Sequence, residues 1–361
     1  MGGVIANPAS SSKTSQAPSG AVAQSCGVGP GPGAGRGPAV RGRQLGDQRL
    51  RVAALDESGQ EKHGEATAGV KRQYMGCAGR VANGVNTVYC SYATADGHAL
   101  VGARMYLPAE QLADPKRRAA LGIPQNVAFQ TKPHLACDIL AEMIADQTPP
   151  WAAGDEVYGR SGELRTFLED NRTGYVMRVG RAFGVEPGTG RTMRADAVAT
   201  RHLTAARRWQ ICSVTGSKGE RAYAWAWTAT ISPRHFLLIR KHLQTGELAY
   251  HYCHVPSGQP VTLMALVRVA CLRWPVEEDF EFGKDHFGLD YSQARLHTAL
   301  LRHIVLAMAA LAVCAVTAAQ ATTRAPAPIL PTTADQQPPE DTGLIAFTVA
   351  EIKRLFTLIT R

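Results

Sequence analysis

The sequence predicts an α/β fold, in which a mixed sheet is flanked by helices and carries a β-rich insertion before its last helical part. Three observations support this prediction. Short apolar runs of strand character end at acidic residues, strand and helix patterns alternate along the chain, and one long block alternates polar and apolar residues between turns. The hydrophobic content of 45% is enough for a large core.

The first part of the chain is predicted to form three strands, at residues 51–55, 87–93 and 99–107. The first strand ends at Asp56, and a polar loop is expected to continue from there to about Asn86. Asp96 and Gly97 form a hairpin signal, so the third strand should be antiparallel to the second.

The next part alternates helix and strand. The predicted elements are a helix at 133–145, a strand at 151–154, a helix at 161–171 and a strand at 174–179. Asp155 follows directly on the strand at 151–154, and Ser161 is suited to cap the helix that it begins.

Later segments are predicted to be strands first and helices afterwards. The helices are expected at 264–273, 275–286, 292–319 and 348–359. We divide the chain into a disordered, low-complexity basic arm (1–48), a core in two parts (49–180 and 266–322), a β-rich insertion (181–265), and a Pro-rich loop with a C-terminal helix (323–361).

Trp225 and Trp227 share one face of an insertion strand. Their rings could stack on a DNA base, but packing in the protein core is the favoured interpretation.

The composition favours a polyanionic partner and a reducing compartment. The formal net charge is +9 and the isoelectric point is about 9.2, which favours nucleic acid or an anionic surface. The eight cysteines form no Cys-x-x-Cys pair. The apolar run at 304–319 has 16 residues, fewer than the roughly 20 that a membrane span needs. We interpret it as a core helix and expect no membrane.

The arm at residues 1–48 is rich in Gly, Ala, Pro and Ser and has no hydrophobic period. Its basic residues could contact DNA phosphates. A misassigned start of the chain explains the same composition, and the residues leave both interpretations open.

The most specific motif lies around Pro275, which suits the first turn of a helix. Glu277, Glu281 and Lys284 then fall on one helix face, and Arg273 precedes Glu277 by one turn. A carboxylate between two cations is typical of a metal ligand with phosphate-holding groups beside it. An ordinary surface helix with salt bridges gives the same pattern.

Asp56 and Asp155 each stand where an apolar strand ends. Either could be a simple turn residue. Together with Glu277, however, they supply three carboxylates that could hold two divalent metal ions for phosphodiester chemistry.

Further basic and aromatic residues are candidate DNA contacts. They are Lys71 and Arg72 after the first motif, and Tyr291 and Arg295 after the third, the latter pair spaced as on one helix face. A solvated basic surface is the alternative for both pairs.

The combined motifs resemble those of bacterial insertion-sequence transposases of the DDE type. They occupy residues 56–59, 69–74, 154–159, 273–280 and 288–295. The nearest branch has a Tyr-Arg-Glu-Lys signature, in which three residues separate Arg from Glu and six separate Glu from Lys. Arg273, Glu277 and Lys284 have this spacing, whereas Ala270 stands at the position of the signature's Tyr. The resemblance covers residue 50 to the end.

This resemblance implies an RNase H-like catalytic core in which Asp56, Asp155 and Glu277 bind two Mg²⁺ ions, with Mn²⁺ able to substitute. Arg273 and Lys284 would hold DNA phosphates. The implied reaction is cleavage at transposon ends followed by strand transfer into target DNA. The implied partners are double-stranded transposon ends and target DNA, with a homodimer on paired ends, in the bacterial cytoplasm and associated with the nucleoid.

Relatives carry a helical DNA-binding region ahead of the first Asp, and this chain has the low-complexity arm there. We interpret the chain as an N-terminally truncated copy. The alternative to an active transposase is an inactive remnant that only binds DNA. A simple RNase H-like nuclease is disfavoured, because such nucleases lack the β-rich block.

Overall fold

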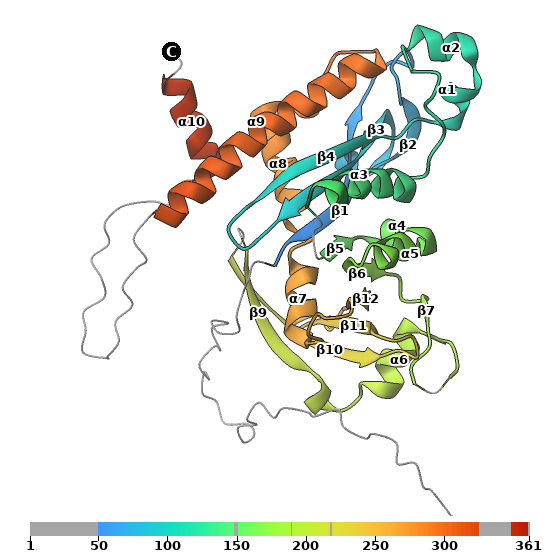
Figure 1. Ribbon diagram of the computed structural model, residues 1–361, viewed down its shortest axis with the longest axis vertical. Coiled ribbons are helices and arrows are strands. Elements are labelled where there is room, and N and C mark those ends of the chain that lie inside the picture. Colours follow the sequence, from blue (N-terminus) through green and yellow to red (C-terminus); the bar gives the residue numbers. More distant parts are fainter. Residues whose placement is uncertain (1–49, 148–150, 189, 217–218, 325–347, 360–361) are drawn as a thin grey trace, which may run out of the picture. The chain divides into compact units, whose positions relative to one another are not determined.

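The structure is a computed structural model that describes residues 50–147, 151–188, 190–216, 219–324 and 348–359 (Figure 1). The predicted arm, 1–48, lies outside the described residues, and so does the Pro-rich loop within 325–347.

A large mixed sheet runs through the described chain, in the order β2-β3-β1-β5-β6-β12-β11-β10-β9, with β4 also paired to β3 (Figure 1). β1, β5 and β6 are parallel to one another, and the other pairs in this sheet are antiparallel. The strands are β1 (Val52–Glu61), β2 (Lys71–Met75), β3 (Arg80–Ala93), β4 (His98–Met105), β5 (Trp151–Gly154), β6 (Gly174–Val179), β9 (Gln210–Gly216), β10 (Gly219–Ala229), β11 (His235–His242) and β12 (Leu248–His254).

Helices cover both faces of this sheet. The helices of the described chain are α1 (Ala109–Ala113), α2 (Pro115–Ala120), α3 (Lys132–Gln147), α4 (Glu156–Gly159), α5 (Gly162–Asp170), α6 (Ala195–His202), α7 (Leu263–Cys271), α8 (Pro275–Phe287), α9 (His297–Arg324) and α10 (Val349–Ile359). A separate small sheet pairs β7 (Gly184–Val185) with β8 (Met193–Arg194). The predicted mixed α/β sheet flanked by helices is therefore confirmed.

Both faces of β1 are buried, which is why its first residues form an unbroken apolar run. Ala54 packs in a cluster with α8 and α9, whereas Ala53 and Leu55 pack in a cluster with α3 and α5 on the opposite face. Because side chains alternate along a strand, Asp56 faces the side of α8 and Glu57 faces the side of α3.

The predicted end of the first strand was wrong. β1 does not stop at Asp56 but continues to Glu61, pairing with β3 along its whole length from Val52↔Ala93 to Glu61↔Gly84. The expected loop to residue 86 contains β2 and the first half of β3. These polar residues form strands because each one has a backbone partner across the sheet, a long-range condition that local composition does not show.

The strands of the predicted insertion extend the core sheet. β12 pairs antiparallel with β6, and β11, β10 and β9 follow in order. Trp225 is 1% exposed and packs in a cluster with α7, as predicted for a core residue. The domain boundaries, including those at 181 and 265, stay predictions.

α9 was predicted to begin at residue 292, but it begins at His297, and the backbone before it is irregular. Its segment His297–Ala321 is long and apolar enough to cross a membrane by length and composition. One side of the helix, with Leu300, Ile304 and Leu311, packs into the core against the sheet. The absence of a membrane span stays a prediction.

α8 is fixed to the sheet by a buried acid that the sequence interpretation did not single out. The carboxylate of Asp279 is fully buried and accepts hydrogen bonds from the Ser91 hydroxyl at 2.5 Å and from His98 Nδ1 at 2.8 Å. His98 Nε2 lies 3.3 Å from Glu278. Burial lowers the pKa of His98, but the bonds to the two carboxylates outweigh this and raise it to about 9.

This cluster predicts a pH-dependent stability. Because the pKa of His98 in the folded chain lies above its ordinary value, the stabilisation is complete below pH 6.5 and is lost as the pH rises through 9. We expect the free energy of unfolding, measured with urea, to fall across this window by up to about 3 kcal/mol. His98→Gln should flatten this part of the profile, while His63→Gln, at an exposed histidine, should not. A His98→Gln profile as steep as that of the unaltered chain would contradict the assignment.

Candidate active site

One guanidinium group connects two of the three predicted acids. Arg273 Nη1 donates to Asp56 Oδ2 at 2.8 Å, and Nη2 donates to Glu277 Oε1 at 2.6 Å. Arg273 and Asp56 are 217 residues apart in the sequence. Arg273 lies between α7 and α8, so the junction of these helices is held against the middle of β1.

The packing of α8 explains why Glu277 reaches this position. Tyr89 is the cross-strand partner of Asp56, so the two side chains share one face of the sheet. The ring of Phe280 meets the ring of Tyr89 edge to face, with centroids 5.3 Å apart. Glu277 precedes Phe280 by one helical turn and therefore lies beside Asp56.

Asp155 occupies the corresponding place on the neighbouring parallel strand. β5 is in register with β1 from Val52↔Trp151 to Leu55↔Gly154, so Asp155 follows at the level of Asp56. Its carboxylate caps α4 by accepting the Val157 N–H at 2.8 Å. The predicted setting of Asp155, directly after a strand, is confirmed.

The acids of this site are crowded and partly removed from water. Burial raises the pKa of Asp56 to about 6, with Arg273 opposing the rise and Asp155 adding to it. Burial also raises the pKa of Asp155, and the Glu57 carboxylate adds to that rise. Cations beside these carboxylates would relieve both effects.

Glu57 lies next to the site, and the sequence interpretation gave it no role of its own. Its side chain turns to the opposite face of β1, where it accepts from Lys132 Nζ at 2.5 Å and from the Tyr158 hydroxyl at 3.0 Å. Tyr158 is fully buried, so it positions Glu57 and has no surface on which a base could stack.

The described residues contain no group of three His, Cys, Asp or Glu side chains arranged to hold a metal ion. The position of Arg273 gives a physical reason, since its guanidinium stands between Asp56 and Glu277. The chemistry of the set nevertheless fits Mg²⁺, a hard cation that takes carboxylate oxygens. A divalent cation would take over the charge balance that Arg273 now supplies.

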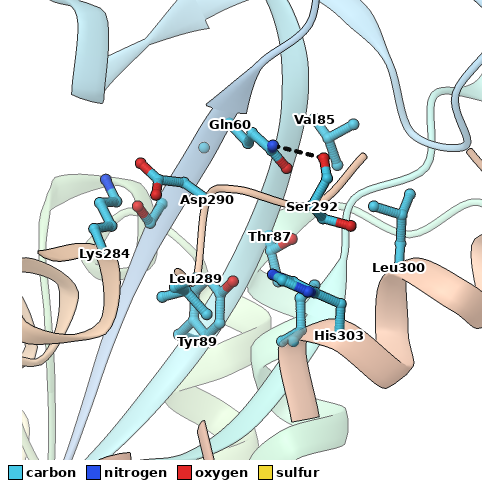
Figure 2. Close-up of a pocket in the computed structure, with 13 residues that line it drawn as sticks. Gln60, Val85, Thr87, Tyr89, Lys284, Leu289, Asp290, Ser292, Leu300 and His303 are labelled. Atoms are coloured by element: carbon cyan, nitrogen blue, oxygen red, sulfur yellow. Dashed lines mark hydrogen bonds between the residues drawn. The ribbon is translucent and has the colours of Figure 1, made fainter. Parts of the chain in front are cut away.

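Lys284 lies on the same side of β1 as Asp56. It lines a cavity of about 20 Å³ together with Ser58, Asp290 and His303 (Figure 2). Within the part of the chain that the structure describes, its ammonium forms no ion pair. An ammonium group that is not held in an ion pair is available to a phosphate.

The two candidate DNA contacts in β2 differ in whether they form an ion pair. Lys71 forms an ion pair with Glu110 at 2.6 Å, whereas Arg72 is exposed. An exposed ion pair of this kind is weak because water and salt screen it, so it would not prevent a phosphate contact. The roles of Lys71 and Arg72 stay predictions.

Tyr291 and Arg295 do not lie on a helix. They belong to the irregular segment before α9, so the predicted one-face relation of positions i and i+4 was wrong. Both side chains are exposed, Tyr291 by 70%. The backbone of this segment is tied to the loop after β1, because the Arg295 carbonyl accepts the Ala68 N–H at 2.9 Å. Their contact with DNA stays a prediction.

Two protein-family models match this chain. The family model for the transposase DDE domain matches residues 130–313, just over half of the chain, and that for the DDE superfamily endonuclease matches residues 40–212. No curated protein matches the sequence. A cryo-EM structure of a piggyBac transposase synaptic complex with hairpin DNA is similar at 9% identity and a TM-score of 0.45, over 84% of this chain and 51% of that one. That likeness is too weak to carry an argument, and this chain spans about half the length of that protein. The two family matches include all three acids of the site, and the chain belongs to the DDE transposase family of nuclease-type enzymes.

Proposed function

We propose that this chain cleaves phosphodiester bonds at the ends of a transposon and joins them to target DNA. The observation that carries the proposal is the meeting of Asp56, Asp155 and Glu277 around one arginine, from two neighbouring parallel strands and a helix. The coarser assignment, a transposase of nuclease type, comes from the family.

The three acids would hold the divalent ions that DDE transposases typically use. We propose two Mg²⁺ ions, for which Mn²⁺ can substitute. Bound there, such ions polarise the phosphoryl group and lower the pKa of a bound water or of a DNA 3′-hydroxyl.

Arg273 has two roles in this proposal. Before metal and DNA bind, it balances the charges of Asp56 and Glu277 and opposes the rise that burial causes in the pKa of Asp56. When cations take that role, its fork of donors becomes available for a phosphate oxygen next to the acids. Lys284, two turns after Glu277 on α8, would hold a further phosphate of the same DNA strand.

The proposed partners are double-stranded transposon ends and target DNA. The net charge of +9 supports a polyanionic partner. Because two ends must be joined in one reaction, we propose a homodimer that acts on paired ends. The proposed location is the bacterial cytoplasm, in association with the nucleoid.

Glu277→Gln should separate binding from cleavage. The amide keeps the size of the side chain but removes a charged metal ligand, so we expect cleavage to fall by more than the roughly 10–100-fold that loss of an outer-shell partner costs. Binding to DNA should persist. The measurement is nicking of labelled duplexes that span the ends of the encoding element, with Mg²⁺ or Mn²⁺. Glu281→Gln, one turn further on the exposed face, is the matched control. Cutting retained by Glu277→Gln would exclude this acid from the site.

Lys284→Ala should weaken DNA binding and make it less sensitive to salt. Removing one cation that holds a phosphate reduces the slope of log affinity against log salt by roughly one. Filter binding at several salt concentrations measures that slope. Lys116→Ala, at an exposed lysine of α2, serves as the comparison. A slope for Lys284→Ala equal to that of the unaltered chain would place Lys284 away from the DNA.

A further inference from the structure

A second polar cavity opens next to the candidate active site, between α4, β6 and β12. Its volume is about 380 Å³, within the range of ligand pockets. Its charged lining consists of Arg160, Arg178, Arg181 and Glu156, three positive groups against one negative group. Leu248 and Ala249 add an apolar part to the lining.

The arginines of this cavity form one loose ion pair among the described residues. Arg178 Nε lies 3.7 Å from Glu156 Oε1, a loose ion pair of half-exposed groups. The guanidinium groups of Arg160 and Arg181 are exposed, and neither forms a hydrogen bond or ion pair to any side chain among the described residues. Three guanidinium groups around one cavity repel one another and are stabilised by a bound anion.

Close packing fixes the cavity to the active-site strand. Asp155 caps the first end of α4, and Arg160 stands at the other end. A Cβ on Gly159 would lie 1.9 Å from the Arg178 carbonyl oxygen, so only glycine lets α4 approach β6 this closely. α4 has four residues, about 6 Å of helix. The arginines therefore begin within about two nucleotide steps of Asp155, since each step along a DNA strand is about 3.4 Å.

The positive charge also extends toward the acids on one face of the sheet. Burial lowers the pKa of His251 to about 3, and Arg240, Arg178 and Arg273 lower it further. Arg178 and Arg273 thus act on the same buried side chain. The positive charge of the cavity lining therefore extends along the sheet toward Arg273, the cation of the candidate active site.

We propose that this cavity binds a phosphodiester of the DNA backbone next to the cleaved bond. The inference rests on the proposed function. Arg160 and Arg181 supply bidentate donors to phosphate oxygens, and the apolar part of the lining accommodates the attached sugar. Glu156 lines the same cavity and repels the phosphate, so it limits how tightly the strand is held.

The test measures DNA binding without cleavage, in the presence of Ca²⁺, on the full chain. The double variant Arg160→Ala/Arg181→Ala should bind the end duplex about 10-fold or more weakly, since each removed group made a charged hydrogen bond. Binding of the double variant should also respond less to salt. For each phosphate that it no longer holds, its affinity should fall about 3.5-fold less than that of the unaltered chain between 50 and 200 mM salt. Arg208→Ala, at an exposed arginine far along the chain in the segment Ala206–Arg208, should leave both quantities unchanged. Glu156→Gln should act in the opposite direction and tighten binding.

Duplexes that each carry one neutral methylphosphonate locate the phosphate. At one position near the cleaved bond, neutralising the phosphate should weaken DNA binding by the unaltered chain but not by the double variant. The proposal would be overturned if the double variant had the same DNA affinity and salt dependence as the unaltered chain. It would also be overturned if Arg208→Ala weakened DNA binding as much as the double variant does. Saturable binding of inorganic phosphate that the double variant loses while its DNA binding is unchanged would overturn it as well.

Failure of the proposed function gives a different pattern. If the unaltered chain does not cut with Mg²⁺ but the methylphosphonate effect still disappears in the double variant, the cavity binds DNA and the catalytic proposal fails. If the unaltered chain cuts and the double variant binds and cuts normally, the catalytic proposal stands and the cavity is not a DNA subsite. Equal thermal unfolding of the variants and the unaltered chain shows that folding does not cause either result.

Discussion

The double hydrogen bond of Arg273 to Asp56 and Glu277 is the contact on which the candidate site depends. It joins the middle of β1 to the start of α8, two elements with no sequence proximity. Removing a carboxylate from water without a partner is unfavourable, so the partly buried cation of Arg273 allows the acids to gather. The packing of Phe280 on Tyr89 and the bonds of Asp279 to the sheet then set the orientation of the helix that carries Glu277.

Much of this site could be predicted from local sequence. The spacing of Arg273, Glu277 and Lys284 lies within one helix and the turn before it, and Asp155 follows a short apolar strand, so in both cases local periodicity is enough. What Arg273 contacts could not be predicted the same way. Sequence indicated a phosphate-holding residue, whereas in the structure its donors are taken up by acids, one of them 217 residues away.

The remaining differences also come from contacts between distant segments. The polar second half of β1 is a strand because β3 pairs with it, and neither segment shows strand character by itself at Gln60 or Asn83. The partners of Asp279 lie on β3 and β4, so its role depends on the register of a hairpin. The irregular segment before α9 shows the opposite case, since helical spacing of Tyr291 and Arg295 occurs without a helix.

The pairing of β12 with β6 makes the strands of the predicted insertion part of the same sheet as β1 and β5. An appended module could be removed to leave a smaller working enzyme. Here, removal would uncover the full length of β6, whose residues are almost all buried. An unprotected apolar edge of this kind recruits strands from other chains. Evolution of this enzyme toward a shorter form would therefore need a new cover for β6 first, and shortened copies would be expected in aggregates before any loss of their chemistry.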